Sequence, residues 1–206
     1  MAANTWFIWF VLAIVVLVGF IKSPRFLGAM GERRVNHALR KLLTEDYRLF
    51  NNVTLPTRRG TTQVDHILLS RFGVFVIETK NMSGWIFGSP DQAKWTQVLN
   101  RRKRQFQNPL RQNYAHVKAI EQLMELPASA VHSLVVFTGT ARPKTPMPDN
   151  VVWSGRALLE QVRSRQLEIF SPQQVPALAE ILQSASLPDT RKTRKDHVRR
   201  LRQNHG

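Results

Sequence analysis

The most apolar stretch of the chain lies close to its start. Residues 5–21 contain no charged side chain, and about 17 helical residues at roughly 1.5 Å each reach about 26 Å, close to the thickness of a bilayer core. Trp6 and Trp9 lie near one end, where amphipathic rings favour the membrane interface. Residues 1–5 carry no Lys or Arg, and no Ala-x-Ala sequence follows, which disfavours a cleaved signal peptide. The pattern predicts an uncleaved transmembrane helix.

Basic residues follow this apolar segment closely, namely Lys22, Arg25, Arg33 and Arg34. Because cytoplasmic flanks of membrane helices carry an excess of Lys and Arg, the amino terminus is predicted to lie outside. The same residues can also contact anionic lipid headgroups. The sequence therefore predicts a single-pass protein of a bacterial inner membrane whose remaining chain faces the cytoplasm.

Helical and alternating patterns follow one another in the rest of the chain. They predict strands over 47–55, 63–70, 73–80, 132–139 and 151–153, and a further short strand pair around 85–88. They also predict helices over about 26–44, from Asn108-Pro109 to Pro127, over about 154–165 and over about 173–184. The inward stripes are expected to contain Leu27, Val35, Leu39 and Leu42 in the first of these helices, and Leu110, Tyr114, Val117, Ile120 and Met124 in the second. This order predicts an α/β, or α+β, domain on one mixed central sheet flanked by helices.

Composition divides the chain into three parts. Residues 1–23 form the predicted anchor, residues 24–187 one compact domain, and residues 188–206 a basic tail. The tail is predicted to be a disordered arm that binds nucleic acid or anionic lipid, because it carries Arg191, Lys192, Arg194, Lys195, Arg199, Arg200 and Arg202.

The charge balance indicates a polyanionic partner. The 206 residues include 30 Lys and Arg against 14 Asp and Glu, a formal net charge of +16. Such an excess favours nucleic acid or an anionic lipid surface as the partner. The chain contains no cysteine, which excludes disulfides, cysteine-ligated zinc, iron–sulfur clusters and thiol catalysis.

The predicted hairpin ends in charged residues. Alternate residues of a strand share a face, so Glu78 and Lys80 point the same way. With Phe72-Gly73 as a two-residue turn, Asp65 on the partner strand lies opposite Lys80. Asp65 and Glu78 are then diagonal neighbours, whereas a register slip by one residue would place them on opposite faces.

These three side chains suit phosphodiester hydrolysis. Two neighbouring carboxylates repel unless a proton or a cation lies between them, and Mg²⁺, or Mn²⁺ in its place, binds carboxylates together with water and substrate phosphate. Lys80 can hold a phosphate oxygen or help to deprotonate an attacking water. Asp65 and Glu78 are therefore candidate metal ligands and Lys80 a candidate catalytic residue. The alternative is an ordinary ion-pair network at the edge of the sheet.

A further acid and a basic stretch add to this candidate site. Glu32 shares the inward stripe of the helix over 26–44, and a core-facing acid needs a partner or a task. The stretch 100–107 is either a solvated loop or a segment that contacts backbone phosphates through Arg101, Arg102, Lys103 and Arg104.

Two histidines lie near the candidate residues in the sequence. His66 follows Asp65 and should face the other way, which favours a packed or hydrogen-bonded role over metal ligation. His116 lies one helical turn beyond Gln112 and is not favoured as a member of the site.

Five blocks of the sequence together resemble one known family. They lie within about residues 30–140 and read GERRVNHAL, LFNNVTL, QVDHILLSRFGVFVIETKNMSGWIFG, WTQ and NPLRQNYAHV. In this order they resemble the nuclease-related domain (NERD) of the restriction-endonuclease-like, or PD-(D/E)xK, nuclease superfamily. The resemblance implies a restriction-endonuclease-like core with a central sheet flanked by helices. Val64 stands where the superfamily usually has Pro.

The resemblance also implies roles for individual residues. Asp65 and Glu78 match metal-binding residues, and Lys80 matches the catalytic lysine. Glu32 matches an acidic residue near the metal, and Gln112 a polar helix residue that lines the site. The expected protein is a membrane-anchored, Mg²⁺-dependent nuclease with DNA as the favoured substrate. The alternatives are a non-catalytic nucleic-acid-binding protein that tethers DNA to the membrane and a surface module whose basic residues bind only lipid.

Overall fold

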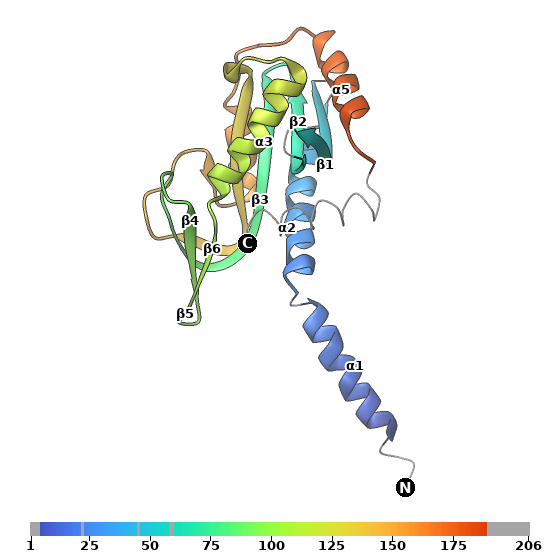
Figure 1. Cartoon of the computed structure of the whole chain (residues 1–206), viewed down its shortest axis with the longest axis vertical. Coiled ribbons are helices and arrows are strands. Elements are labelled where there is room, and N and C mark those ends of the chain that lie inside the picture. The colour runs from blue at the N-terminus through green and yellow to red at the C-terminus, as the bar shows by residue number, and fades with distance from the viewer. Residues whose placement is uncertain (1–4, 22, 45, 58–59, 189–206) are drawn as a thin grey trace.

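The computed structural model describes residues 5–21, 23–44, 46–57 and 60–188 (Figure 1). The basic tail predicted over 188–206 therefore lies, from residue 189 onward, outside the described residues. The same holds for Lys22, one of the basic residues behind the apolar segment.

The apolar segment forms helix α1, Thr5–Ile21, which extends away from the rest of the molecule (Figure 1). Its large apolar side chains are exposed, including Trp6, Trp9 and Phe20. Among the described residues, however, the structure contains no helix that combines the length and the apolar character needed to cross a membrane. The prediction of a transmembrane helix is therefore not supported.

Within the described residues, seven strands form one mixed sheet. The strands are β1 (Tyr47–Thr57), β2 (Gly60–Ser70), β3 (Gly73–Phe87), β4 (Lys94–Leu99), β5 (Arg102–Gln107), β6 (Val131–Pro143) and β7 (Val151–Val152). Strands β1 to β5 pair antiparallel in chain order, while β6 pairs parallel with both β3 and β7. The predicted mixed sheet within an α/β fold is confirmed.

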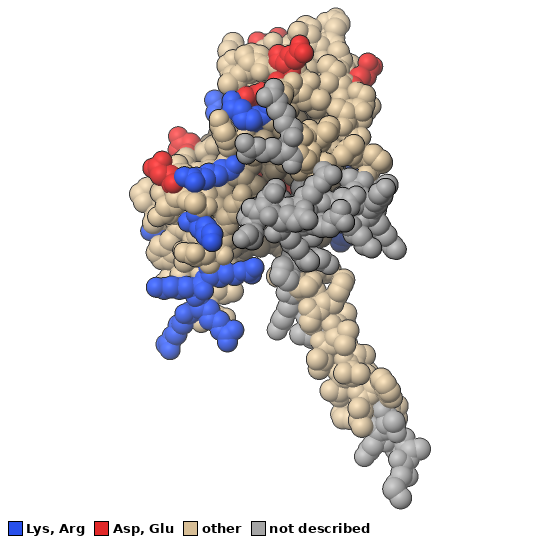
Figure 2. All heavy atoms as spheres, viewed as in Figure 1, with Lys and Arg blue, Asp and Glu red and all other residues tan. Residues whose placement is uncertain are grey.

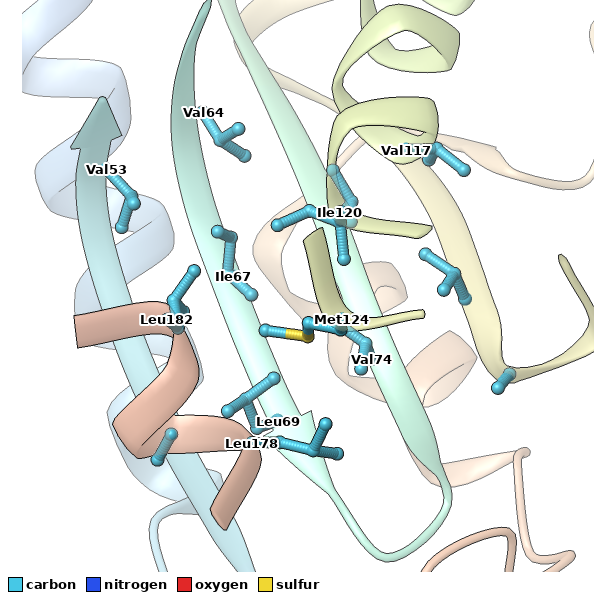
Figure 3. Close-up of a cluster of buried hydrophobic side chains, with 14 of the residues drawn as sticks. Val53, Val64, Ile67, Leu69, Val74, Val117, Ile120, Met124, Leu178 and Leu182 are labelled. Carbon is cyan, nitrogen blue, oxygen red and sulfur yellow. The ribbon is translucent and has the colours of Figure 1, made fainter. Parts of the chain in front are cut away.

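Helices cover both faces of this sheet. They are α2 (Pro24–Leu39, continued by a 3₁₀ turn at Arg40–Leu42), α3 (Pro109–Met124), α4 (Gly155–Arg163) and α5 (Gln174–Ala185). Helices α3 and α5 pack over β1, β2 and β3, where Ile120, Met124, Leu178 and Leu182 meet strand residues (Figure 3). Helices α2 and α4 pack on the other face. Both faces of the strand Gly73–Ile77 are covered, which explains its unbroken apolar sequence.

Two helix residues predicted to be buried are exposed. Tyr114 of α3 is 62% exposed and Leu27 of α2 is 40% exposed. On α3 the buried side chains include Asn113 and His116 instead, next to the expected Val117. The apolar stripe was predicted by assuming that polar residues face water, whereas here polar residues occupy part of the buried face.

The basic stretch 100–107 belongs to a hairpin and not to a loop. Trp85, predicted to belong to a short local strand pair, lies in the extended end of β3 and pairs with β4. Strands β4 and β5 are joined at Asn100 and Arg101, whose φ angles of 49° and 63° are those of a tight two-residue hairpin turn. Since β5 ends the order β1-β2-β3-β4-β5, its basic side chains lie on an edge strand.

The register of the β2–β3 hairpin differs from the prediction by two residues. Ser70 pairs with Gly73, so the turn is Arg71-Phe72 and not Phe72-Gly73. Ile67 consequently lies opposite Val76 instead of Glu78. Because side chains alternate with a period of two, this offset by itself does not move a side chain from one face of the sheet to the other.

Candidate active site

Strand β3 has one continuously paired edge and one interrupted edge. Strand β6 runs along the first of these from Val74 onward. On the second edge β2 pairs only as far as Ile77, and β4 pairs only from Trp85. In the part of the chain that the structure describes, residues 78–84 therefore have no strand partner on that edge. Glu78, the first residue of this gap, begins the candidate active site.

Asp65 reaches the gap from β2. The ladder between β1 and β2 skips Asp65 and Asn52, and Asn52 has a left-handed φ of 53°. Val64 and Ile67 both pack into the core under α3 and α5, although they are three residues apart and would point to opposite faces of a regular strand. The alternation of faces is therefore interrupted at Asp65, which lies between them. Asp65 Oδ2 accepts a hydrogen bond of 2.8 Å from the Thr79 N–H. The carboxylate is thereby fixed at the open edge of β3.

Lys80 is held between two oxygen atoms. Its Nζ donates to Glu78 Oε1 at 2.6 Å and to Gln112 Oε1 at 2.9 Å. The Glu78 side chain is 2% exposed and the Lys80 side chain 21%, so Lys80 remains partly accessible to solvent. The structure thus brings together four of the predicted residues, Asp65, Glu78, Lys80 and Gln112, across two strands and a helix.

Helix α3 is fixed against the sheet by buried amides. Asn108 caps its start by accepting from Leu110 N, and its Nδ2 donates to main-chain oxygens of the β3–β4 connection. One turn later, Asn113 Nδ2 donates to Val76 O at 2.9 Å and lies 3.1 Å from Leu134 O of β6. These bonds set the position of the helix face that presents Gln112 to Lys80.

His116 was missed as a site residue. Its Nε2 lies 3.3 Å from Glu78 Oε2, and its Nδ1 lies 2.8 Å from Thr62 Oγ1. The signal was present in the sequence, because residues four apart share a helix face and His116 follows Gln112 by four. The tilt of α3 over the sheet, which decides what this face meets, is a tertiary feature.

The two carboxylates differ in their electrostatic surroundings. Burial raises the pKa of Asp65, as do the charges of Glu78 and Glu32, against a hydrogen bond from Thr79. Burial would also raise the pKa of Glu78, but His116 and Lys80 outweigh it and hold that pKa below its ordinary value. Of the two carboxylates, Asp65 is therefore the one whose negative charge is less well balanced by neighbouring cations.

The carboxylates of Asp65 and Glu78 are the candidate ligands for a divalent cation. Glu78 Oε2 is buried and makes no well-formed hydrogen bond within the described residues. Among those residues, no group of three or more His, Asp or Glu side chains forms a complete metal site. Mg²⁺ commonly takes one or two carboxylates and completes its shell with water and substrate phosphate. Asp65 and Glu78 fit that pattern as the two protein ligands.

The remaining predicted residues lie around this centre or apart from it. Glu32 of α2 is partly buried, and its charge acts on Asp65. His66 is buried, and its Nδ1 lies 2.8 Å from Asn51 Oδ1, in the hydrogen-bonded role expected for it. The hairpin residues Arg101, Arg102, Lys103 and Arg104 are exposed, and Figure 2 shows Lys and Arg gathered over the β4–β5 hairpin.

Comparison with known proteins identifies the family. Residues 27–138, more than half of the 206-residue chain, match the nuclease-related domain, NERD. The chain therefore belongs to the nuclease-related domain family, which indicates a nuclease-related function and confirms the predicted resemblance. Over 103 residues it is 52% identical to an uncharacterized protein of Bacillus anthracis, covering 50% of this chain and 49% of that protein. The chain thus spans about half the length of this curated relative.

His66 should make stability depend on pH. Burial lowers the pKa of His66 to about 4, against the charge of Glu78, whereas an unfolded histidine titrates near about 6.5. The unfolded chain then binds more protons between these values, so stability falls as the pH drops from about 6.5 toward about 4. Lowering the pH from about 7 to about 5 should cost about 2 kcal/mol through this residue.

Urea unfolding of the full chain in detergent, followed by circular dichroism at both pH values, measures this cost. His66→Gln should remove about 2 kcal/mol of the pH dependence. His37→Gln, which changes an exposed histidine of α2, serves as the matched control and should leave it unchanged. Equal pH dependence in wild type and His66→Gln would contradict the assignment.

Proposed function

We propose that this protein is a metal-dependent nuclease that hydrolyses phosphodiester bonds, with DNA as its substrate. The observation that carries the proposal is the open edge of β3, where Lys80 Nζ is held by Glu78 and Gln112 and the Asp65 carboxylate is fixed beside them. The membership of the chain in the nuclease-related domain family supports the same chemistry.

Each side chain has a task in this proposal. Asp65 and Glu78 would hold Mg²⁺ or Mn²⁺, and a bound ion of this kind supplies Lewis acidity toward the scissile phosphate. Lys80, accessible to solvent, orients the attacking water or holds a nonbridging phosphate oxygen. Gln112 keeps the Lys80 ammonium pointed into the gap. Glu32 adds negative charge at the centre and thereby favours cation binding.

Loss of Lys80 or Asp65 should abolish cleavage. The full chain in detergent, incubated with supercoiled plasmid DNA and Mg²⁺, should nick the plasmid, and Lys80→Ala or Asp65→Ala should lower the rate about 100-fold or more. Chelation of the divalent ion with EDTA should stop the reaction. Gel electrophoresis of plasmid forms over time measures the rate.

Lys41→Ala and Glu180→Ala, which change exposed residues away from the site, serve as controls and should cleave like wild type. Equally low cleavage by wild type, Lys80→Ala and Asp65→Ala would point to a contaminating nuclease and overturn the proposal. DNA binding that persists without any cleavage would favour the non-catalytic tethering protein.

We further propose that the β4–β5 hairpin binds the phosphate backbone of the substrate. Arg102, Lys103 and Arg104 follow one another on the edge strand β5, and their side chains are exposed. Main-chain pairing with β4 holds β5 in place, with Arg102 and Arg104 on one face of the strand and Lys103 on the other. Contacts of this kind supply affinity without sequence recognition.

Replacing these three residues together by alanine should weaken duplex DNA binding and flatten its salt dependence. The slope of log affinity against log salt should fall by about 3, because each lost phosphate contact removes about 0.9. Fluorescence anisotropy with a labelled duplex measures both quantities. The triple variant Arg156→Ala, Arg163→Ala, Arg165→Ala removes the same charge elsewhere, and an equal effect would show that only net charge matters.

We also propose that α1 attaches the protein to a membrane, with the remaining chain on the cytoplasmic side. Side chains such as Phe7, Val11, Val15 and Phe20 are exposed along α1, and apolar surface of this extent favours transfer out of water. The basic residues that follow the segment agree with a cytoplasmic location of the domain.

Charges placed on α1 should release the protein from membranes. Val11→Lys with Val15→Asp should move most of the protein from the carbonate-washed membrane pellet into the soluble fraction, because burying a charge in lipid is costly. Leu167→Lys with Ile181→Asp changes exposed apolar residues elsewhere and should have no effect. Soluble wild-type protein would contradict membrane attachment.

A further inference from the structure

A groove runs between α3 and the end of the β1–β2 hairpin where β1 finishes and β2 begins. It has a volume of about 770 Å³, within the usual range for ligand sites. The lining combines apolar side chains with hydroxyl groups, one ammonium group and one aromatic ring, contributed by Pro56, Thr57, Thr61, Thr62, Tyr114, Ala115, Lys118, Ala119, Gln122 and Leu123. No part of the proposed nuclease chemistry uses this groove.

The groove borders the candidate active site directly. Thr62, one of its lining residues, places its Oγ1 2.8 Å from His116 Nδ1. On the opposite side of that ring, His116 Nε2 lies 3.3 Å from Glu78 Oε2. A single buried histidine side chain therefore separates Glu78 from the groove, and a strand with a phosphate at Lys80 would run close to it.

Tyr114 is the aromatic group of the groove. It occupies a helix position where the hydrophobic spacing predicts burial, yet its side chain is 62% exposed. Lys118, one turn later, places its Nζ 5.4 Å from the centre of the Tyr114 ring and pairs with Glu121. Exposed ion pairs of this kind contribute little, so Lys118 can exchange Glu121 for a phosphate.

We infer that this groove binds an unpaired nucleotide of the substrate strand, whose base stacks on Tyr114. The inference rests on the proposed nuclease function and specifies its substrate as a nucleic acid with a single-stranded part next to the cleaved bond. Exposed aromatic rings next to cations are a common means by which proteins hold unpaired bases. In an intact duplex the base faces are covered by their neighbours, so a duplex gains nothing from Tyr114.

Binding can be measured apart from cleavage. The Lys80→Ala full chain in detergent, without divalent ions, is titrated into a labelled single strand of about 12 nucleotides and into a duplex of the same length. In this background Tyr114→Ala should weaken single-strand binding about tenfold or more, while duplex binding changes less than about twofold. Tyr114→Phe keeps the ring and should bind like the parent protein.

A cross-linking experiment locates the contact directly. A strand containing 5-iodouracil, irradiated in complex with the Lys80→Ala protein, should form its cross-link at Tyr114, as identified by mass spectrometry of the peptides. Thermal unfolding should confirm that Tyr114→Ala folds like the parent protein, as expected for an exposed residue.

Unchanged single-strand binding by Tyr114→Ala would overturn the inference. Equal weakening of single-strand and duplex binding, or cross-links confined to the exposed Trp85 of β3, would overturn it as well. These readouts need no catalysis. A failure of the nuclease proposal would appear only in the plasmid assay, and the two failures are therefore distinguishable.

Discussion

The separation of β2 from β3 beyond the His66–Ile77 pair is the constraint on which the candidate site depends. Had the two strands stayed paired, the main-chain groups after Ile77 would be satisfied by β2. Instead the Thr79 N–H donates to the Asp65 carboxylate, which replaces a main-chain acceptor with a charged one. The same separation leaves room for Lys80 to meet Gln112 of α3. One break in a ladder thus produces both the opening and its charged lining.

The Glu78 and Asp65 carboxylates differ in how well neighbouring cations balance their negative charges. Glu78 is nearly inaccessible to solvent, but Lys80 and His116 offset the cost of burying its charge. Burial raises the pKa of Asp65, and the charges of Glu78 and Glu32 raise it further, since among the described residues no cation is in direct contact with Asp65. A divalent ion would relieve this repulsion at the point where a substrate phosphate would add more negative charge. Part of the buried face of helix α3 accordingly consists of polar residues, whereas the buried face of a helix with only a structural role is mostly apolar.

Several features of the fold could be predicted because they depend on local chemistry. The unbroken apolar run of Gly73–Ile77 indicated a strand covered on both faces, and Asn108-Pro109 indicated the start of α3. The proximity of Asp65 to Glu78 was also predictable, although the turn lies one residue earlier than predicted, because the resulting two-residue offset in register preserves the faces of a strand. Tyr114 and His116 were misplaced for one shared reason. Hydrophobic spacing tells which helix face is apolar on average, but it does not tell which polar side chains find partners beneath the helix.

By itself, the sequence determined the order of the elements outside the β4–β5 hairpin, the family of the chain and the residue types gathered for chemistry, since these depend on periodicity and on the identity of the side chains. Only the tertiary structure decided which groups meet. The interrupted edge of β3, the contact of His116 with Glu78 and the groove beside Tyr114 each join segments far apart in the chain. Their geometry depends on how α3 lies across the sheet, and that position is fixed by long-range contacts such as those of Asn113 with two neighbouring strands.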